Sequence, residues 1–320
     1  MTDGAISRHC ALPDQIAVRV HGLDAADFLQ AQLINDVRPL NPERSQLSGW
    51  CNPKGRLLAV FRLFRDADGW FLRLPAELAG ATVQRLRMFV LRAQVRIEPL
   101  QEAWAGLAVW GERSAEALRG AGVPAPEAAD GVAWHAGVAV LRVPGRAPRF
   151  ECWGPAETVH ALAESCARHG AAPAPRTAWE LEEIQAGLPE IHTTTREQFV
   201  PQTVNLDLVG GLSFSKGCFP GQEIVARTKY LGKLKRRMFR LRANADAAEP
   251  GQAVYRPERS PTDPAGTVVR WAPSTAGGIE LLASLRIEDH AAGGLTLGDP
   301  DGPGLKPLPL PYPITVEQGT

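Results

Sequence analysis

The sequence has few cysteines for its length, and no two of them form a CxxC pair. The 320 residues contain five: Cys10, Cys51, Cys152, Cys166 and Cys218. An odd number of widely spaced cysteines argues against a disulfide framework and against a zinc or iron–sulfur cage held by one chain. The seven histidines are also dispersed, so we expect no metal site. Reduced cysteines and the lack of a basic, apolar leader favour a cytoplasmic protein.

The chain also lacks long apolar runs and an excess of charge of either sign. No run is long enough to cross a bilayer, so we expect no membrane partner. The formal net charge is +0, and any attraction for anions must therefore come from local patches. A hydrophobic content of 44% in 320 residues predicts a soluble globular protein with two or three compact units.

Hydrophobic periodicity predicts a mixture of helices and strands. Ile16, Val18 and Val20 alternate along a strand over 14–23, after which Asp24 is expected to cap a helix. Further strands are predicted over 57–64, 70–74, 93–98, 105–110, 132–143 and 149–153, and helices over 76–91, 114–121, 156–169 and 177–187. After about residue 235, strand-like pieces at 237–241, 267–271 and 279–287 alternate with Pro/Gly turns, which predicts a small β-domain.

One cysteine lies in the unusual segment Lys216-Gly217-Cys218-Phe219-Pro220-Gly221-Gln222-Glu223. The two glycines permit backbone conformations that a side chain forbids, and Pro220 favours entry into a helix over 222–231. A thiol near a helix N-terminus and beside Lys216 is expected to have a lowered pKa. Glu223 could accept a proton or cap the helix. The alternative is a small buried cysteine that the glycines leave room for.

The next segment is strongly basic. Residues 224–245 contain no Asp or Glu, but they contain Arg227, Lys229, Lys233, Lys235, Arg236, Arg237, Arg240 and Arg242. Such a run is suited to a polyanion, or it is a solvated face of ordinary kind. Upstream, Trp179 opens a predicted helix, where it could stack on a flat heterocycle or fill a core.

These motifs resemble those of a known family. Lys216–Glu223, continued to Arg227, is similar to the KGCYxGQE signature of the YgfZ folate-binding family. Further matching pieces are Phe28–Gln32 with Asn35-Asp36-Val37, Lys54-Gly55-Arg56, Ala186–Pro189, and Gln198–Gln202 with Asn205-Leu206. The similarity runs from about residue 14 to 242. The wider superfamily includes the aminomethyltransferase (T-protein) of the glycine cleavage system and related mitochondrial iron–sulfur assembly factors.

The resemblance implies an α+β fold of the T-protein type. Residues 1–235 would form two interleaved subdomains around a central folate channel, the second subdomain covering roughly 50–170. Residues 236–320 would form an antiparallel β-barrel. The ligand would be tetrahydrofolate or a polyglutamylated form. The role would be assembly or repair of iron–sulfur enzymes, including those that thiolate tRNA, with such clients as partners.

The resemblance also implies site residues. Cys218 would be the functional thiol, with Lys216 and Glu223 beside it. Trp179 matches a family tryptophan implicated in folate binding, and Gln15 lies near the position of a second one. Asn35, Gln185 and Arg227 lie in matching motifs and complete the predicted folate-binding set.

Departures from the family pattern limit the chemistry. Phe219 stands where the signature usually has Tyr. The acidic pair of T-proteins is replaced by Arg56-Leu57-Leu58-Ala59, and their Arg-x-Glu by Glu183-Ile184-Gln185. Without that carboxylate no obvious group manages the proton at the folate amine, which argues against glycine-cleavage chemistry. The alternatives are a folate-dependent one-carbon transferase that uses Cys218 and, ranked last, direct contact with RNA through the basic run.

Overall fold

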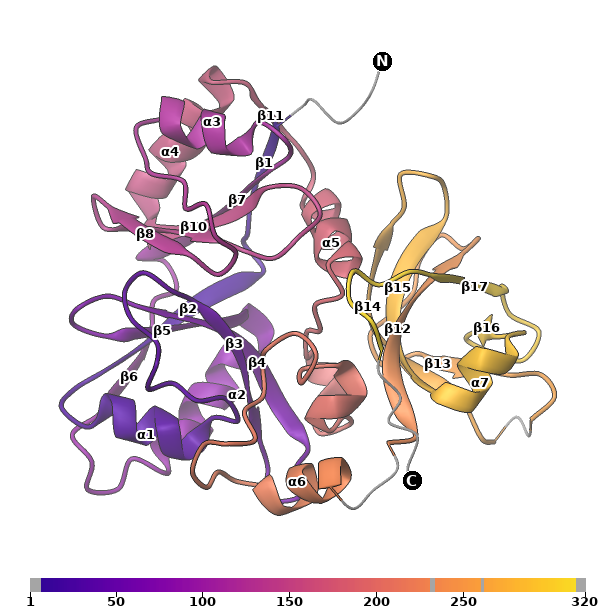
Figure 1. Cartoon of the computed structure of the whole chain (residues 1–320). Coiled ribbons are helices and arrows are strands. Elements are labelled where there is room, and N and C mark those ends of the chain that lie inside the picture. Colours follow the sequence, from indigo (N-terminus) through magenta and orange to yellow (C-terminus); the bar gives the residue numbers. More distant parts are fainter. Residues whose placement is uncertain (1–6, 231–233, 260–261, 315–320) are drawn as a thin grey trace. The chain divides into compact units, whose positions relative to one another are not determined.

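The structure is a computed structural model that describes residues 7–230, 234–259 and 262–314 (Figure 1). Its helices and sheets make a mixed α+β protein, as expected. The chain divides into two compact units. The first contains Met1–Gln30, Val37–Gln46 and Phe61–Trp179, and the second contains Ala31–Asp36, Leu47–Val60 and Glu180–Thr320.

The first unit contains a six-stranded sheet covered on one face by two helices. In spatial order its strands are β11 (Ala171–Pro173), β1 (Ser7–Ala11), β7 (Trp104–Trp110), β10 (Arg149–Pro155), β9 (Val138–Arg142) and β8 (Val132–His135). The helices are α3 (Ser114–Gly120) and α4 (Ala156–Arg168). Strand alternation divides the side chains between two cores. Leu107 and Val109 face the helices, whereas Ala108 and Trp110 join a second core.

That second core lies against another sheet, whose order is β3 (Gln46–Cys51), β4 (Leu57–Arg65), β5 (Trp70–Pro75), β2 (Gln15–His21) and β6 (Arg96–Pro99). Residues 47–60 of β3 and β4 are grouped with the second unit. Phe64 and Phe71 stack at 5.1 Å between ring centroids and pack in the same core as Trp153. Helices α1 (Ala25–Gln32) and α2 (Ala76–Arg87) follow β2 and β5 along the chain. The strands expected over 57–64 and 70–74 are confirmed as β4 and β5, which pair as an antiparallel hairpin across residues 66–69.

Two local predictions were wrong in detail. The single strand expected over 132–143 is two strands, because Ala136 and Gly137 adopt φ angles of 47° and 78° and reverse the chain. The helix expected over 76–91 ends at Arg87. Asp24 lies directly before α1, as expected, and its backbone carbonyl accepts from the Phe28 N–H at 2.9 Å, while its carboxylate accepts a hydrogen bond from the Gln94 backbone N–H at 2.7 Å.

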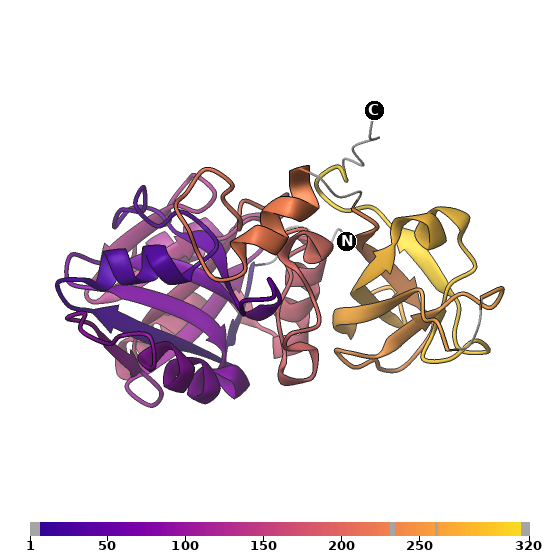
Figure 2. The ribbon, with the colours of Figure 1, turned by 90° about the horizontal axis from the view of Figure 1, so that it is seen from below.

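The second unit contains a curled antiparallel half-barrel. Its strands run in the order β16 (Thr296–Leu297), β13 (Ala253–Tyr255), β14 (Gly266–Pro273), β15 (Ile279–Arg286), β12 (Arg236–Ala243) and β17 (Leu305–Leu308). Figure 2 shows these strands curling. The side chains between them form an apolar core that contains Leu241, Val268 and Leu281. The two edges meet where Thr296 bridges Gly304 and where Leu305 N–H donates to the Leu295 carbonyl at 2.8 Å. Helix α7 (Ile287–Ala292) follows β15.

The remaining segments of the second unit precede the barrel. They are α5 (Arg176–Gln185), whose first residues belong to the first unit, the short 3₁₀ helices η2 (Thr193–Thr195) and η3 (Pro201–Val204), and α6 (Gln222–Tyr230). Asn205 ends η3 in a left-handed conformation, and its side chain pairs with the Met238 backbone of β12. The domain boundary at residue 235 stays a prediction. Within the described ranges, no helix has the length and apolar character that a bilayer crossing requires.

Candidate functional site

The segment that carries Cys218 begins with a turn built around Ser213. The Ser213 hydroxyl accepts hydrogen bonds from the backbone N–H groups of Ser215 and Lys216, at 3.4 and 3.2 Å. The Ser213 N–H donates to the Ile34 carbonyl at 3.1 Å. The loop is therefore fixed at its first residues to a segment about 180 positions away in the sequence.

Lys216 fixes the middle of the same loop from inside. Only 7% of this residue is exposed, and its ammonium donates a hydrogen bond to the Leu33 carbonyl. The ammonium also lies 5.4 Å from the centroid of the buried Phe219 ring, within cation–π range. The role that this geometry gives Lys216 is to hold the loop, since its charge is directed at Leu33 and Phe219.

Gly221 fixes the end of the loop, where α6 begins. Its φ angle is 81°, and a Cβ on it would lie 2.6 Å from the Gly55 Cα and from the Asn52 carbonyl oxygen. Gly55 has a φ of 68° and a Cβ on it would lie 3.1 Å from Ile224 Cβ. Two glycines thus let the loop and the turn at Gly55 approach closely. Gly217 differs, because it has open space around its Cα and no positive φ, so this part of the glycine prediction was wrong.

The turn beneath α6 is organised by Asn52. Its carboxamide oxygen accepts from the backbone N–H groups of Lys54 and Arg56, at 2.9 and 3.0 Å, and its Nδ2 donates to the Glu197 carboxylate at 3.0 Å. The Arg56 guanidinium donates to the Gln198 carbonyl at 2.6 Å. The Lys54-Gly55-Arg56 motif is therefore a rigid support for the helix start.

Cys218 is the exposed one of the five cysteines, all of which are described. Burial raises the pKa of the Cys10 thiol to about 12 and of the Cys166 thiol to about 11, and it raises the pKa values of Cys51 and Cys152 as well. Those four thiols stay protonated and enclosed. The alternative interpretation of Cys218 as a buried spacer was wrong, and the fold presents this thiol to solvent.

Helix α6 carries charged side chains beside the thiol. Glu223 is exposed in the first turn, where the helix dipole stabilises an acid. The buried Gln202 donates to the Val225 carbonyl at 2.7 Å and attaches the helix to η3. In the last turn Arg227 is exposed, and the Lys229 ammonium lies 3.8 Å from the Phe214 ring centroid. Glu223 and Arg227 thus share a short helix with Cys218 at its entrance.

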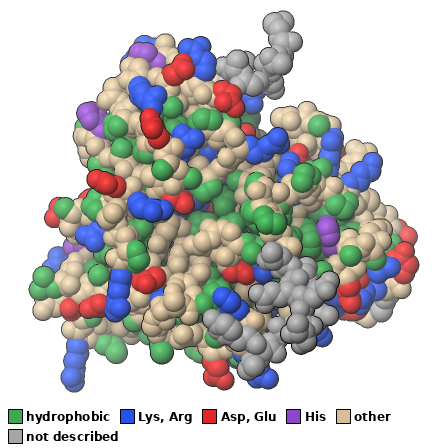
Figure 3. Space-filling model, in the orientation of Figure 1, with side chains coloured by type: hydrophobic (Ala, Val, Ile, Leu, Met, Phe, Trp, Pro, Cys, Tyr) green, Lys and Arg blue, Asp and Glu red, His purple; other side chains and the backbone are tan. Residues whose placement is uncertain are grey.

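The basic run does not form one patch. Arg237 makes a two-bond ion pair with Asp207, at 2.6 and 2.9 Å, and Arg240 pairs with Glu280 at 2.5 Å; both arginines are buried. Lys233 lies outside the described residues. On the face shown in Figure 3, Lys and Arg side chains are interspersed with Asp and Glu side chains. The run is therefore partly structural.

Trp179 occupies a core. Only 1% of it is exposed; Trp110 lies 5.5 Å away between ring centroids, and the buried Arg149 guanidinium lies 4.9 Å from the Trp179 ring centroid. A folate ring could stack on Trp179 only after displacing one of these neighbours. The role of Trp179 in folate binding stays a prediction.

Gln15 and Asn35 are engaged by the protein itself. In the first unit, Gln15 accepts from Arg73 at 3.2 Å, and Arg73 forms a buried ion pair with Glu151 at 2.7 Å. In the second unit, the Asn35 Nδ2 donates to the carbonyls of Leu47 and Gly210, both at 2.8 Å. The side-chain amides of both predicted ligand-binding residues therefore stabilise the fold through hydrogen bonds within the protein.

Apart from the buried Trp179, the predicted folate-binding residues whose side chains make no hydrogen bond with the described parts of the chain are Gln185 and Arg227. Gln185 is half-buried at the end of α5, and Arg227 is exposed on α6. Both belong to the second unit, as does Cys218. Their amide and guanidinium remain available to a polar ligand.

Sequence reasoning missed a buried acidic cluster in the second unit. The Arg270 guanidinium of β14 lies 2.5 Å from a Glu180 oxygen, 3.5 Å from Glu183 and 3.9 Å from Glu190, and it donates to the Leu188 carbonyl at 3.1 Å. Burial alone would lower the pKa of Arg270, but the three carboxylates raise it above its ordinary value. The available signals were the i, i+3 spacing of Glu180 and Glu183 and an arginine within an apolar strand. Across the described residues, no group of three acidic, histidine or cysteine side chains is arranged to hold a metal ion.

Comparisons with known proteins agree with this architecture. Residues 10–136 match the family described as the GCVT N-terminal domain. The crystal structure of glycine cleavage system aminomethyltransferase T from Bartonella henselae matches with a TM-score of 0.78 and 19% identity, covering 96% of this chain and 86% of that one. The expected aminomethyltransferase T fold is thereby confirmed.

Two sequence relatives share one name. The tRNA-modifying protein YgfZ of Colwellia psychrerythraea is 29% identical over 237 residues, which cover 74% of this chain and 71% of the relative. The tRNA-modifying protein YgfZ of Edwardsiella ictaluri is 33% identical over 313 residues, which cover 94% of this chain and 91% of the relative. With the signature segment around an exposed Cys218, this similarity shows that the chain belongs to the YgfZ family.

Proposed function

We propose that this protein binds tetrahydrofolate, or a polyglutamylated form of it, and supports the assembly or repair of iron–sulfur enzymes, including those that thiolate tRNA. Cys218 is its functional thiol. The relatives' name, tRNA-modifying protein, and the aminomethyltransferase T fold support a folate-linked role in tRNA modification. The observation that carries the proposal is the exposed Cys218 on a loop anchored by buried Lys216 and by Gly221.

That loop geometry favours function over packing. The chain uses a buried ammonium and a positive-φ glycine to hold this segment, and both features are destabilising unless specific contacts offset them. The product of these contacts is an accessible sulfur at the entrance of α6. A thiol so placed can meet a client protein, a cluster or a one-carbon unit.

The predicted folate residues fit the ligand in part. Gln185 and Arg227 can supply an amide and a cation to the polar groups of a folate, while Trp179, Gln15 and Asn35 would have to exchange internal contacts for ligand contacts. When bound, tetrahydrofolate would supply a carrier for one-carbon units. The chain's own contribution would be to bind and orient it and to present Cys218.

A Cys218→Ala variant separates the folate site from the thiol. We expect it to retain tetrahydrofolate binding, measured by calorimetry, and to lose support of tRNA thiolation in cells that depend on this protein. Ser215→Ala is the matched control, because Ser215 is an exposed neighbour in the same loop. Full tRNA thiolation in cells with the Cys218 variant would contradict the role of the thiol. Absence of tetrahydrofolate binding by the wild type would contradict the assignment of the ligand.

Arg227→Ala tests the folate assignment within the second unit. It should weaken tetrahydrofolate binding, because it removes an exposed cation beside the signature loop. The exposed Lys235 extends the same test to the polyglutamate tail. If Lys235 contacts the tail, Lys235→Ala reduces the preference for polyglutamylated over monoglutamylated folate; equal preference in both proteins contradicts that contact.

A second candidate is a folate-dependent one-carbon transferase, favoured by the fold and by the accessible sulfur of Cys218. The residues Arg56 to Ala59 supply no carboxylate for the proton at the folate amine, which argues against transfer of the glycine-cleavage type but not against every one-carbon transfer. Incubation with isotope-labelled methylene-tetrahydrofolate distinguishes the two functions. Label recovered on Cys218 supports the transferase, and an unlabelled Cys218 supports binding alone.

A further inference from the structure

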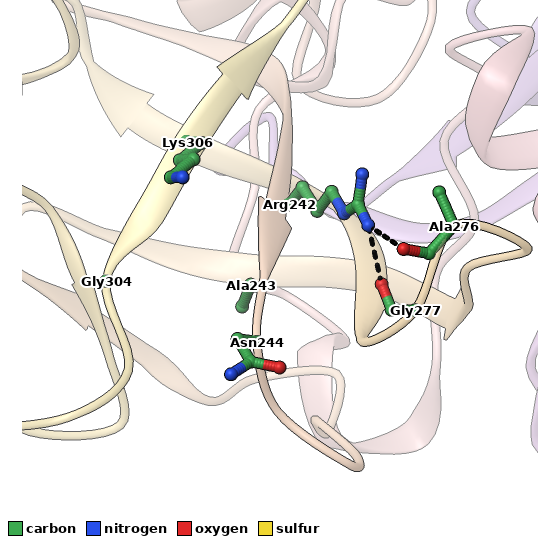
Figure 4. Close-up of a pocket in the computed structure, with 7 residues that line it drawn as sticks. All are labelled: Arg242, Ala243, Asn244, Ala276, Gly277, Gly304 and Lys306. Carbon is green, nitrogen blue, oxygen red and sulfur yellow. Dashed lines mark hydrogen bonds between the residues drawn. The ribbon is translucent and has the colours of Figure 1, made fainter.

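A pocket of about 390 Å³ lies on the barrel of the second unit, at the ends of β12 and β17 (Figure 4). Its lining contains two cations, Arg242 and Lys306, together with Asn244 and the turn at Ala276 and Gly277. None of the lining residues is acidic. The pocket is separate from the residues of the proposed folate and thiol site.

The two cations come from paired positions of neighbouring strands and line the pocket from two sides, with Arg242 extending toward Ala276 and Gly277 and Lys306 projecting from β17 (Figure 4). Arg242 and Lys306 are directly opposed across the antiparallel pair β12 and β17, so their side chains project from the same face of the sheet. Like charges in this arrangement repel and destabilise the pair. The nearest cross-strand acid, Glu280, is already engaged, because its two oxygens accept from Arg240 and Ser274. Because Glu280 is directly opposed to Arg242 across β12 and β15, its single charge offsets part of the positive charge of Arg240, Arg242 and Lys306, and this group of side chains keeps a net positive charge.

Arg242 is fixed in place before any ligand binds. Its Nη2 donates to the carbonyls of Ala276 and Gly277 (Figure 4). That turn is held close to β12 by Gly278, which has a φ of 66° and whose Cβ would overlap the Ala243 carbonyl oxygen. Among the described residues, the Arg242 Nε and Nη1 make no hydrogen bond, so their hydrogens remain available.

The hydrogen-bond donors of Arg242 and Lys306 that remain available determine which shape of anion the pocket binds best. A carboxylate binds arginine best through a two-bond fork, and both forks of a guanidinium include Nη2. Since the hydrogens of Nη2 are directed to two carbonyls, a planar carboxylate gains little here. A tetrahedral oxyanion can instead take separate hydrogen bonds from Arg242 Nη1 and from the Lys306 ammonium. We infer that this pocket binds a phosphate group through Arg242 and Lys306.

Phosphate could reach the pocket from two sources, as a small phosphate compound or as the backbone of an RNA. The shared chemistry is a tetrahedral oxyanion that offsets the charges of Arg242 and Lys306. The inference is independent of the proposed function, so a Cys218→Ala variant should bind phosphate as the wild type does.

Titration with inorganic phosphate, followed by phosphorus NMR at low ionic strength, tests the inference. Lys306→Ala should weaken phosphate binding about tenfold, because one charge-assisted hydrogen bond is lost. Lys306 is exposed and opposed to a like charge, so its replacement should not lower the temperature of thermal unfolding. Arg146→Ala is the control, since it removes one exposed charge from a loop of the first unit and should have no effect.

A second arm identifies the source of the phosphate. If the group belongs to RNA, an unmodified tRNA transcript displaces inorganic phosphate, and Lys306→Ala lowers the slope of log K against log salt by about 1. If it belongs to a small compound, the tRNA does not compete while phosphate binding still depends on Lys306. The inference is overturned if phosphate does not bind, if Lys306→Ala binds it unchanged, or if γ-diglutamate binds there more tightly than phosphate.

Discussion

Gly221 and Gly55 meet backbone to backbone, so closely that a Cβ on Gly221 would lie 2.6 Å from the Gly55 Cα. This contact joins the loop of Cys218 to the turn of the Lys54-Gly55-Arg56 motif. Two sequence motifs separated by more than 160 residues are therefore one structural feature.

The contact predicts that replacing the two glycines of the signature affects the free energy of unfolding to very different extents. Gly221→Ala should lower the free energy of unfolding by about 2–4 kcal/mol, because it combines a left-handed backbone with a steric clash. Gly217→Ala should change it by less than about 0.5 kcal/mol, since that Cα has open space around it. Urea unfolding of both variants checks the pair, and equal losses would contradict the geometry.

Lys216 provides a second test of the loop. Lys216→Met keeps the aliphatic stem but removes the hydrogen bond to the Leu33 carbonyl, so we expect a loss of about 1–3 kcal/mol in the free energy of unfolding. Lys235→Met is the matched control, because that lysine is exposed. A Lys216 variant as stable as the control would show that the buried ammonium does not hold the loop.

Stability should fall in alkaline solution. Burial raises the pKa of Cys10 from 9.0 to about 12 and that of Tyr312 from 10.0 to about 12. Both groups therefore hold their protons more tightly when folded, and their contribution is present below pH 9 and lost as the pH rises toward 12. Each group adds a slope of up to about −1.4 kcal/mol per pH unit within its window.

Tyr312→Phe isolates one part of this slope. The variant loses the hydrogen bond from the Tyr312 hydroxyl to the Gly187 carbonyl, so it should be less stable at pH 7 and yet lose stability less steeply above pH 10. Chemical denaturation at a series of pH values measures both effects. An unchanged alkaline slope would show that Tyr312 titrates alike in the folded and unfolded chain.

The Arg237–Asp207 ion pair should be structural. Arg237→Ala leaves the Asp207 carboxylate without its partner and should cost about 3–5 kcal/mol of unfolding free energy. The double variant Arg237→Met with Asp207→Leu should cost less than the single change, because no uncompensated charge remains. A double-mutant cycle with no coupling would contradict this role.

Hydrophobic periodicity predicted those helices and strands in which the apolar residues repeat regularly. The alternation of Ile16, Val18 and Val20 predicted strand β2, and the apolar spacing along α4 predicted that helix nearly to its ends. The short strands β1, β11, β16 and β17 were missed, because two to five residues carry no period that can be read. Their identity depends on distant partners, as when Ser7 pairs with Ala171.

The loop of Cys218 was visible in the sequence, but the direction of its side chains was not. Lys216 was expected to act on the thiol; its partner, Leu33, lies 183 positions away. The basic run was misleading for the same reason, because Asp207 and Glu280, which offset two of its arginines, lie outside it. The sequence shows where charged residues lie along the chain, but only the folded structure shows which residues they pair with.

The bridge between Thr296 and Gly304 has a consequence for recognition at the barrel. Where the first and last strands of a sheet join, few backbone donors and acceptors are left for a peptide to pair with. At this bridge a partner therefore gains little by adding a strand of its own, whereas β14 beyond Val268 pairs with β15 alone. Recognition at this corner of the barrel must depend on side chains, and the bridge protects these two end strands from edge-to-edge pairing with other molecules.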